Sequence, residues 1–176
     1  MAGMWQGNML ICSYKKGALL NPRDTQLLKR TFKTASSARR NGNHPFGALL
    51  AGPQNEILLK AENSVVSKQD ITGHAELNLV REASRIYSPE FLAQCTLYSS
   101  TEPCPMCAGA IFWSNIRRVI FGLSEVGLYD LIGPETSEEV LLLSCRDVFQ
   151  RGQKEIEVIG PLLEEEARKV HRGFWV

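Results

Sequence analysis

Two short groups of metal-ligand residues constrain this chain more than any other feature of its sequence. A His-x-Glu pair, His74 and Glu76, stands at the start of one expected helix, and a Pro-Cys-x-x-Cys motif with Cys104 and Cys107 opens another. One histidine and two cysteines are soft or borderline ligands, a set that suits zinc. Because one metal ion held by all three would tie two helix starts together, the fold must bring these starts into contact.

The number of ligands indicates a catalytic rather than a structural metal site. Three protein ligands leave one coordination position for water, whereas structural zinc sites are closed by four. Glu76 follows His74 by two residues, which makes it a poor fourth ligand but allows it to exchange protons with that water. Both cysteines lie at a helix N-terminus, where the dipole favours thiolate. A redox Cys-x-x-Cys protein is an alternative, but it would leave His74 and Glu76 without a role.

Strand and helix patterns alternate along the chain, which predicts an α/β fold with a mixed or parallel sheet flanked by helices. We expect one domain over residues 1–176, in which residues 1–20 form an N-terminal arm without clear periodicity. The segments 62–73 and 124–135 are expected to be loops. The expected helices are 22–41, 72–86, 103–114, 136–149 and 162–171, and the expected strands are 46–51, 56–61, 95–100, 118–123 and 155–159.

Composition excludes several classes of protein. The chain has 176 residues, with 20 basic and 19 acidic side chains, and this near-neutral balance argues against broad nonspecific adhesion to nucleic acid or anionic lipid. No apolar run approaches the roughly 18 residues of a membrane span. Five cysteines are an odd number, and no secretory leader precedes them, so we expect a reducing, cytoplasmic location.

The motifs together resemble the cytidine-deaminase-like superfamily, on its nucleobase and tRNA-adenosine branch, over about residues 21–174. Residues 44–49 (HPFGAL) are similar to the first strand of that family, and residues 101–111 (TEPCPMCAGAI) to its second metal motif. Residues 160–166 (GPLLEEE) are similar to the opening of its last helix. The resemblance implies a three-layer α/β/α fold with a five-stranded mixed sheet, zinc at two helix N-termini, and commonly a homodimer.

The resemblance also implies a reaction. A zinc-dependent hydrolase of this kind deaminates an amino-substituted nucleobase or nucleoside and releases ammonia. One zinc per chain would be held by His74, Cys104 and Cys107, and Glu76 would carry the proton. Asn63 would orient the base, main-chain groups near Ala75 and Pro103 would read its edge, and aromatic rings would wall it. The residues expected to contact substrate are Phe46, Asn63, Ala75, Pro103, Trp113, Asp130 and Trp175.

The choice of substrate stays open at this point. The aromatic pair at residues 112–113 resembles bacterial guanine deaminases, which favours a guanine-type purine, and residues 171–176 are aromatic rather than a basic, tRNA-gripping tail. The segment 124–135 departs from both branches, so Asp130 is either a reader of the purine edge or an exposed loop residue. The alternatives are a tRNA-specific adenosine deaminase and a catalytically silent zinc-binding subunit; a silent subunit usually lacks the glutamate found at Glu76. The aromatic tail is either a docking segment or a lid over its own or a partner's site.

Overall fold

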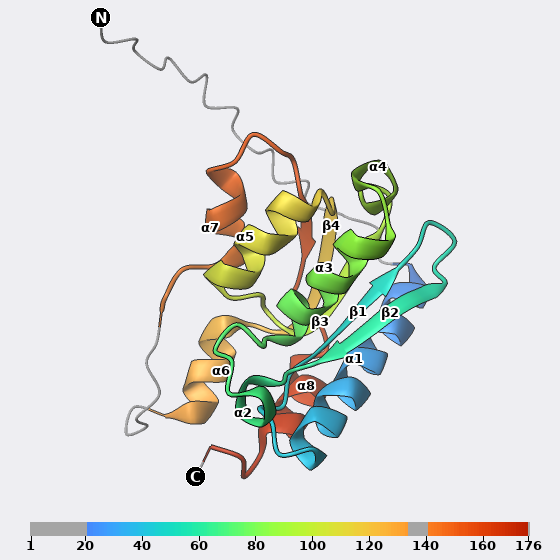
Figure 1. Ribbon diagram of the computed structural model, residues 1–176. Coiled ribbons are helices and arrows are strands. Elements are labelled where there is room, and N and C mark those ends of the chain that lie inside the picture. The colour runs from blue at the N-terminus through green and yellow to red at the C-terminus, as the bar shows by residue number, and fades with distance from the viewer. Residues whose placement is uncertain (1–20, 134–140, 176) are drawn as a thin grey trace, which may run out of the picture.

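A computed structural model describes residues 21–133 and 141–175, and shows a five-stranded sheet between two layers of helices (Figure 1). The predicted α/β/α architecture is therefore confirmed. Among the described helices, none combines the length and apolar character needed to cross a membrane. The elements are α1 (Pro22–Arg40), β1 (Gly47–Ala51), β2 (Ile57–Glu62), α2 (Val65–Lys68), α3 (Ala75–Ile86), α4 (Pro89–Leu92), β3 (Thr96–Thr101), α5 (Pro105–Ser114), β4 (Arg118–Leu123), α6 (Glu125–Ile132), α7 (Cys145–Gln150), β5 (Glu157–Ile159) and α8 (Glu164–His171).

The sheet has the strand order β2-β1-β3-β4-β5. Strand β1 runs antiparallel to both β2 and β3, whereas β3, β4 and β5 are parallel to one another. The carboxyl ends of β3 and β4 therefore lie at the same edge, where ligands collect in open sheets of this kind. The loop that carries Cys104 leaves β3 at that edge.

Both faces of the sheet are buried, because strand side chains alternate between two helix layers. Leu49, Tyr98 and Ile120 pack in the cluster formed with α1, α6 and α8. Their neighbours Leu50 and Leu97 pack in the cluster formed with α3, α5 and α7. The start of β1 approaches α1 so closely that a Cβ on Gly47 would lie 2.5 Å from a backbone nitrogen of the helix.

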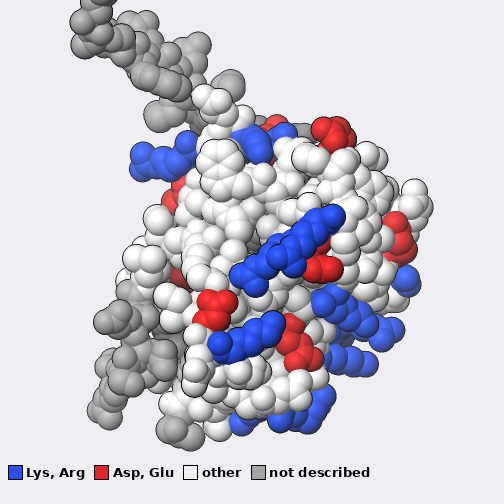
Figure 2. Space-filling model, viewed as in Figure 1, with Lys and Arg blue, Asp and Glu red and all other residues white. Residues whose placement is uncertain are grey.

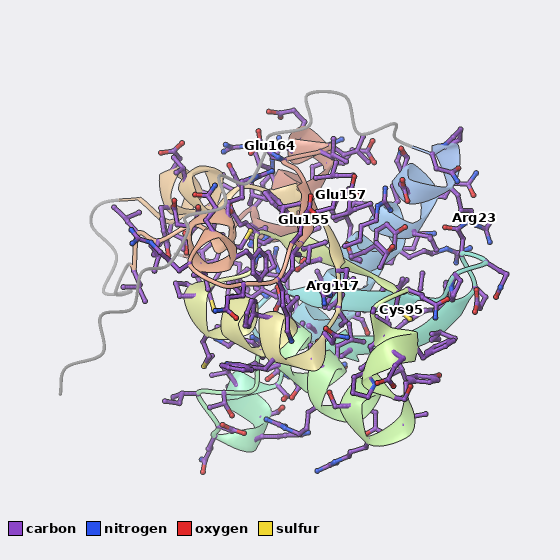
Figure 3. The ribbon with its side chains drawn as sticks, turned by 90° about the horizontal axis from the view of Figure 1, so that it is seen from above. Arg23, Cys95, Arg117, Glu155, Glu157 and Glu164 are labelled. Carbon is purple, nitrogen blue, oxygen red and sulfur yellow. The ribbon has the colours of Figure 1, made fainter. Side chains whose placement is uncertain are left out.

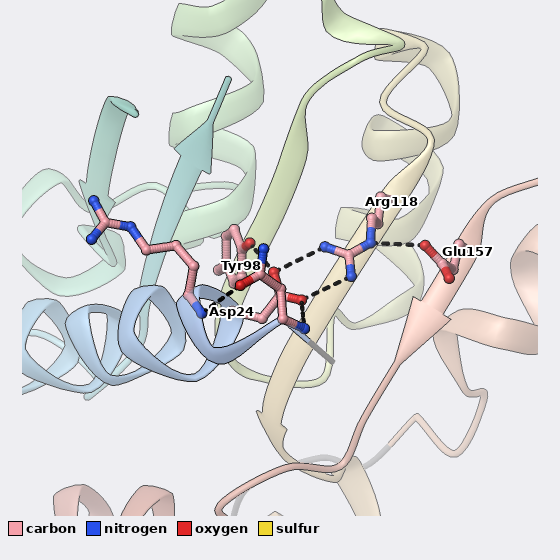
Figure 4. Close-up of polar contacts among 6 residues, drawn as sticks. Asp24, Tyr98, Arg118 and Glu157 are labelled. Carbon is pink, nitrogen blue, oxygen red and sulfur yellow. Dashed lines mark hydrogen bonds and ion pairs between the residues drawn. The ribbon is translucent and has the colours of Figure 1, made fainter. Parts of the chain in front are cut away.

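A polar network joins the start of α1 to the edge of the sheet remote from the metal motifs (Figure 4). The Asp24 carboxylate is buried and accepts hydrogen bonds of 3.1 and 3.0 Å from the two Nη atoms of Arg118. It also accepts a bond of 2.6 Å from the Tyr98 hydroxyl. Arg118 Nε bonds Glu157 at 2.8 Å, so one network holds α1, β3, β4 and β5. Arg117 and Glu155 lie next to this network (Figure 3). Nη1 of Arg117 donates a hydrogen bond of 3.4 Å to the backbone carbonyl of Glu155.

Most expected elements are present with slightly different ends. The helix expected over 72–86 begins at Ala75 instead, because the carbonyl of Gly73 accepts the backbone N–H of Ser64 at 2.7 Å and keeps that residue in the preceding loop. Likewise the helix expected over 103–114 begins at Pro105, after Cys104 as its N-cap. The strand expected over 118–123 is found as predicted.

The region after β4 corrects the sequence prediction. Part of the segment expected as a loop over 124–135 is helix α6, which begins after the N-cap Ser124. The helix expected over 136–149 is wrong in its described part: residues 141–144 are not helical, and α7 begins at Cys145 after its N-cap Ser144. The three leucines at 141–143 are exposed. Residues 136–140 and the expected arm over 1–20 lie outside the described residues.

Candidate metal centre and active site

The three predicted zinc ligands come together at the starts of two helices. His74 is the N-cap of α3, Cys104 is the N-cap of α5, and Cys107 lies in the first turn of α5. The Nδ1 atom of His74 lies 3.5 Å from the sulfur of each cysteine. All three ligand atoms lie within 4.8 Å of one another.

This spacing fits zinc. Zn–S and Zn–N bonds of about 2.3 and 2.05 Å at a tetrahedral angle place nitrogen and sulfur about 3.6 Å apart, close to the 3.5 Å observed for both pairs. The His-Cys-Cys donor set is also one that zinc prefers. The geometry therefore agrees with the ligand set expected from the sequence, which has one protein ligand fewer than a closed structural zinc site.

The electrostatics of the cluster prepare Cys104 for metal binding, whereas the pKa values of His74 and Cys107 are raised, so a metal ion would displace their protons. Hydrogen bonding from Cys107, together with that from His74, lowers the pKa of the Cys104 thiol to about 4. Cys104 is therefore a thiolate at neutral pH, the form that binds metal. Hydrogen bonding with Cys104 is also the main reason why the pKa of His74 is raised. A zinc ion would replace these contacts with three coordination bonds.

Glu76 lies beside the ligands on the first turn of α3. Its side chain is buried, Oε1 accepts a hydrogen bond of 2.6 Å from the Ser99 hydroxyl, and Oε2 lies 3.6 Å from the Cys107 sulfur. Burial raises the pKa of Glu76, against the opposing effects of Ser99 and His74. A buried carboxyl group with a raised pKa beside a candidate metal site is suited to proton transfer.

Three of the expected substrate contacts lie on the elements that surround this cluster. Asn63 follows β2 and is buried, with its Oδ1 accepting from the backbone N–H of Val65 at 3.0 Å. The backbone N–H of Asn63 donates to the carbonyl of Phe46 at 3.1 Å. Ala75 is the buried first residue of α3, and Pro103 is a buried residue directly before Cys104. The backbone of Ala75 directly follows His74, and the backbone of Pro103 directly precedes Cys104, so both adjoin the ligands.

Two expected contacts lie elsewhere. Trp113 is on the last turn of α5, nine residues after Cys104, so about 13 Å of helix rise separates them. Its ring is 79% exposed and lies 5.9 Å from Lys154 Nζ. Asp130 is exposed on α6. The structure therefore does not bring Trp113 to the ligand cluster, and it places Asp130 on a helix surface.

The carboxyl-terminal aromatic residues pack beside Phe46. Trp175 lies 6.0 Å from Phe46 and 6.1 Å from His171 between ring centroids, and its indole N–H donates to His171 Nδ1 at 3.3 Å. Arg39, at the end of α1, fixes this tail by donating to the carbonyls of Val170, Arg172 and Gly173 at 3.0, 2.8 and 3.0 Å. The tail is thus a docked segment next to the residue that precedes β1.

Sequence reasoning missed the roles of two polar residues near the site. Ser99 supports Glu76, and Glu102 accepts backbone hydrogen bonds from Glu125 and Cys145. A signal for both was present: polar residues close an otherwise apolar buried strand directly before Cys104. A buried polar residue requires a partner, but the sequence does not show which partner the fold supplies.

Comparison with known proteins identifies the family. Residues 22–123 match the cytidine and deoxycytidylate deaminase zinc-binding region, and the chain belongs to this family. It is 40% identical over 156 residues to a probable cytosine deaminase of Schizosaccharomyces pombe, covering 89% of this chain and 94% of that protein. It is 43% identical over 102 residues to a tRNA-specific adenosine deaminase of Buchnera aphidicola subsp. Schizaphis graminum, covering 58% and 67%.

The fold has solved relatives. The structure described as guanine deaminase from Nitrosomonas europaea superposes with a TM-score of 0.67 at 21% identity, covering 88% of this chain and 84% of that one. At this identity the likeness shows the fold alone. The family resemblance expected from the sequence and its zinc-binding character are confirmed.

Proposed function

We propose that this chain is a zinc-dependent hydrolytic deaminase of a free amino-substituted nucleobase or nucleoside, with a guanine-type purine favoured. The observation that carries the proposal is the buried Glu76 carboxylate, held beside a His-Cys-Cys cluster of tetrahedral spacing. Zinc, when bound by His74, Cys104 and Cys107, supplies acidification of a coordinated water. Side chains and backbone groups of this chain transfer the protons and orient the base.

Glu76 moves the protons in this proposal. Ser99 holds Oε1, so Oε2, on the side of Cys107, is the atom that receives a proton from the attacking water. Glu76 delivers this proton to a ring nitrogen as the carbon–oxygen bond forms at the amine-bearing carbon. It then takes the second proton from the newly attached hydroxyl and passes it to the departing amine, so that the carbonyl forms, the carbon–nitrogen bond breaks and ammonia leaves. Water and the amino-substituted ring thus become ammonia and a carbonyl-bearing ring, with no other reactant.

The surroundings of the cluster orient the base. We assign the amide of Asn63 and the backbone near Ala75 and Pro103 to its polar edge; Ala75 directly follows His74, and Pro103 directly precedes Cys104. Phe46, with Trp175 packed at 6.0 Å, is the aromatic wall. We expect Trp113 and Asp130 to contribute less to substrate binding than these groups do, since Trp113 is at the far end of α5 and Asp130 is on the surface of α6.

Three observations favour a small substrate over tRNA. Acidic side chains are interspersed among the basic ones on the face shown in Figure 2, whereas a phosphate-binding groove requires an excess of positive charge. The Arg39 guanidinium is occupied by three carbonyls of the tail. The probable cytosine deaminase relative is 40% identical over 89% of this chain, whereas the tRNA-specific adenosine deaminase of Bacillus subtilis, which covers a similar 86%, is 33% identical.

The test is an ammonia-release screen of free bases and nucleosides with zinc-loaded protein, run beside a tRNA anticodon stem-loop. We expect turnover of at least one free base or nucleoside, and RNA affinity no tighter than the nonspecific level of about 10⁻⁴–10⁻⁶ M. Adenosine-to-inosine conversion in the stem-loop, with no activity on any small substrate, would identify the tRNA alternative instead. Zinc binding without any deamination would support a silent subunit.

The tail provides a second test of the small-substrate proposal. Deletion of residues 172–176 should raise the KM for a free base and lower turnover, because water would enter the site, while zinc content stays the same. Trp175→Ala should raise the KM more than Trp113→Ala does, since Trp175 packs against Phe46 and Trp113 does not. In a tRNA deaminase the deletion would instead weaken RNA binding and reduce its salt dependence.

We further propose a cytoplasmic homodimer. Several large apolar side chains are exposed, among them Ile71, Trp113 and Leu142 at 81%, 79% and 73%, and apolar surface of this kind often marks an interface. Light scattering of the zinc-loaded protein should give twice the chain mass of 19.7 kDa. A mass of one chain at micromolar concentration would contradict the dimer.

A further inference from the structure

One carboxylate next to the metal ligands accepts hydrogen bonds from the first turns of two helices. Oε2 of Glu102 accepts from the backbone N–H of Glu125 at 3.2 Å. Oε1 accepts from both the backbone N–H and the thiol of Cys145 at 3.3 Å. The backbone N–H of Glu102 donates to the carbonyl of Leu123 at 2.8 Å, which joins the loop to the end of β4.

Glu102 completes a capping pattern that the two helices share. Ser124 is the N-cap of α6 and accepts from the N–H of Gly127 at 3.1 Å. Ser144 is the N-cap of α7 and accepts from the N–H of Asp147 at 3.1 Å. Each serine satisfies the third N–H of its helix and leaves the first one without a helical acceptor. Glu102 accepts both first N–H groups, so one side chain serves the starts of two helices.

The position of Glu102 links these helices to the metal site. Only Pro103 separates Glu102 from the ligand Cys104, and the ring of proline restricts the backbone between them. Burial, with contributions from the Glu102 and Cys104 charges, raises the pKa of Glu125 to about 7. The start of α6 therefore lies within electrostatic range of the ligand loop, in a part of the molecule with low exposure to water.

We infer that Glu102 is a positioning residue, which fixes the starts of α6 and α7 relative to the loop that carries Cys104 and thereby sets how closely substrate fits against the site. Its kinetic effect rests on the proposed deaminase function, whereas its structural effect does not. If Glu102 contributed only general stability, its loss would lower the melting temperature without a specific change at the two helix starts or in the KM.

Amide hydrogen exchange in the zinc-loaded Glu102→Gln variant tests the structural part. Glutamine keeps the size of the side chain, but only one of its two terminal atoms can accept, so at least one helix start loses its bond. We expect exchange of the amide proton of Glu125, Cys145 or both to accelerate about tenfold, as for loss of a hydrogen bond to a charged group. Unchanged exchange at both positions in the folded variant would overturn the inference.

Glu164 provides the matched control. It lies at the start of α8 (Figure 3), and its Oε1 accepts from the N–H and hydroxyl of Ser124 at 3.2 and 2.7 Å. It therefore holds the start of α6 from the side of α8, and its side-chain hydrogen bonds within residues 21–133 and 141–175 do not reach α7. Glu164→Gln should change exchange in α6 and leave the amide of Cys145 unchanged. Equal acceleration at Cys145 in both variants would contradict a specific role of Glu102.

A pair of variants at Cys145 isolates one bond and keeps Glu102 itself intact. Cys145→Ala and Cys145→Pro both remove the thiol, but only proline removes the N–H that bonds Glu102. Proline is favoured at the first position of a helix, and Ser144, with φ −62° and ψ 152°, already has the conformation required before proline. We expect the proline variant to have a KM about tenfold above that of the alanine variant, a loss in the range for supporting residues of metal sites, with similar kcat and zinc content.

The outcomes separate the two proposals. Equal KM values for the proline and alanine variants would overturn the role of Glu102 in substrate fit, and this pair also decides the matter if Glu102→Gln does not fold. A wild-type protein that binds zinc but deaminates no base, nucleoside or RNA would refute the proposed function. In that case the exchange experiment still decides whether Glu102 fixes the two helix starts.

Discussion

Ser99 donates a hydrogen bond of 2.6 Å to Oε1 of Glu76, so the central strand of the sheet orients the carboxylate of α3. Ser99 lies on β3, with its side chain on the face that α3 covers. One oxygen of Glu76 is thereby fixed, and the other lies on the side of the zinc ligands. A hydroxyl that holds one carboxylate oxygen allows the second to gain and lose a proton without a change of rotamer.

This arrangement predicts that Glu76 serves chemistry and not metal binding. Glu76→Gln should retain one zinc per chain and the fold, while kcat falls by about 10²–10⁴, the usual contribution of a positioned general acid–base. Ammonia release and elemental analysis of the same sample measure both quantities. As a comparison, Ser99→Ala should reduce kcat less, by about tenfold, because it removes orientation only. Loss of zinc from Glu76→Gln would mean that Glu76 is a ligand.

The second prediction concerns the ligands themselves. Cys104→Ala should lose zinc and become less stable, because bound metal stabilises the folded state by about 4 kcal/mol when free zinc exceeds the Kd 1,000-fold. Cys95→Ala is the matched control, since Cys95 is also buried but packs in the core away from the ligands. Elemental analysis and thermal unfolding with and without a chelator are the measurements. A full zinc load in Cys104→Ala would exclude it as a ligand.

The metal site could be predicted from sequence because its information is local. His74 and Glu76 share one helix start, Cys104 and Cys107 share another, and the chemistry of the residue types limits what they bind. The strand at 118–123 was equally clear, because its Val, Ile and Phe side chains are buried. Helix α6 was not predicted, because the segment 124–135 was taken as a loop, although Ser124 is the cap that begins the helix.

Contacts between distant segments could not be predicted. The bonds from Arg39 to the tail join residues 131–134 positions apart, and no local pattern indicates such a pairing. Trp113 was assigned to substrate because it follows the metal motif in sequence, but the rise of α5 carries it to the other end of the helix. Glu102 was part of a quoted motif, yet its two helix partners are 23 and 43 residues away.

The network around Asp24 predicts a loss of stability without a loss of chemistry. Although burial acts to raise it, hydrogen bonds from Arg118 and Tyr98 hold the pKa of Asp24 below its ordinary value. Asp24→Asn should therefore cost about 3–5 kcal/mol of unfolding free energy, because a partly buried arginine loses its counter-charge. Glu157→Gln, which removes the half-exposed partner of the same arginine, should cost less than about 1 kcal/mol. Urea unfolding measures both, and similar costs for the two variants would contradict the prediction.

His171 predicts a pH dependence of stability. It is buried beside Phe46 and Trp175, and burial, with the nearby charge of Arg39, lowers its pKa from 6.5 to about 4. The unfolded chain therefore binds a proton between pH 6.5 and 4 that the folded chain does not bind. The contribution of His171 to the unfolding free energy should be highest above pH 6.5 and fall by about 3 kcal/mol as the pH drops to 4, at 1.36 kcal/mol per unit of pKa difference.

His171→Asn isolates this contribution. Asparagine keeps an acceptor close to the position of Nδ1, which receives the indole N–H of Trp175, but it does not titrate. Urea unfolding of both proteins at several pH values between 4 and 7 gives the difference in unfolding free energy. This difference should increase in favour of the wild type as the pH rises from 4 to 6.5 and then stay level, because all other titrating groups are common to both proteins. Parallel curves over this range would show that His171 has an ordinary pKa in the folded protein.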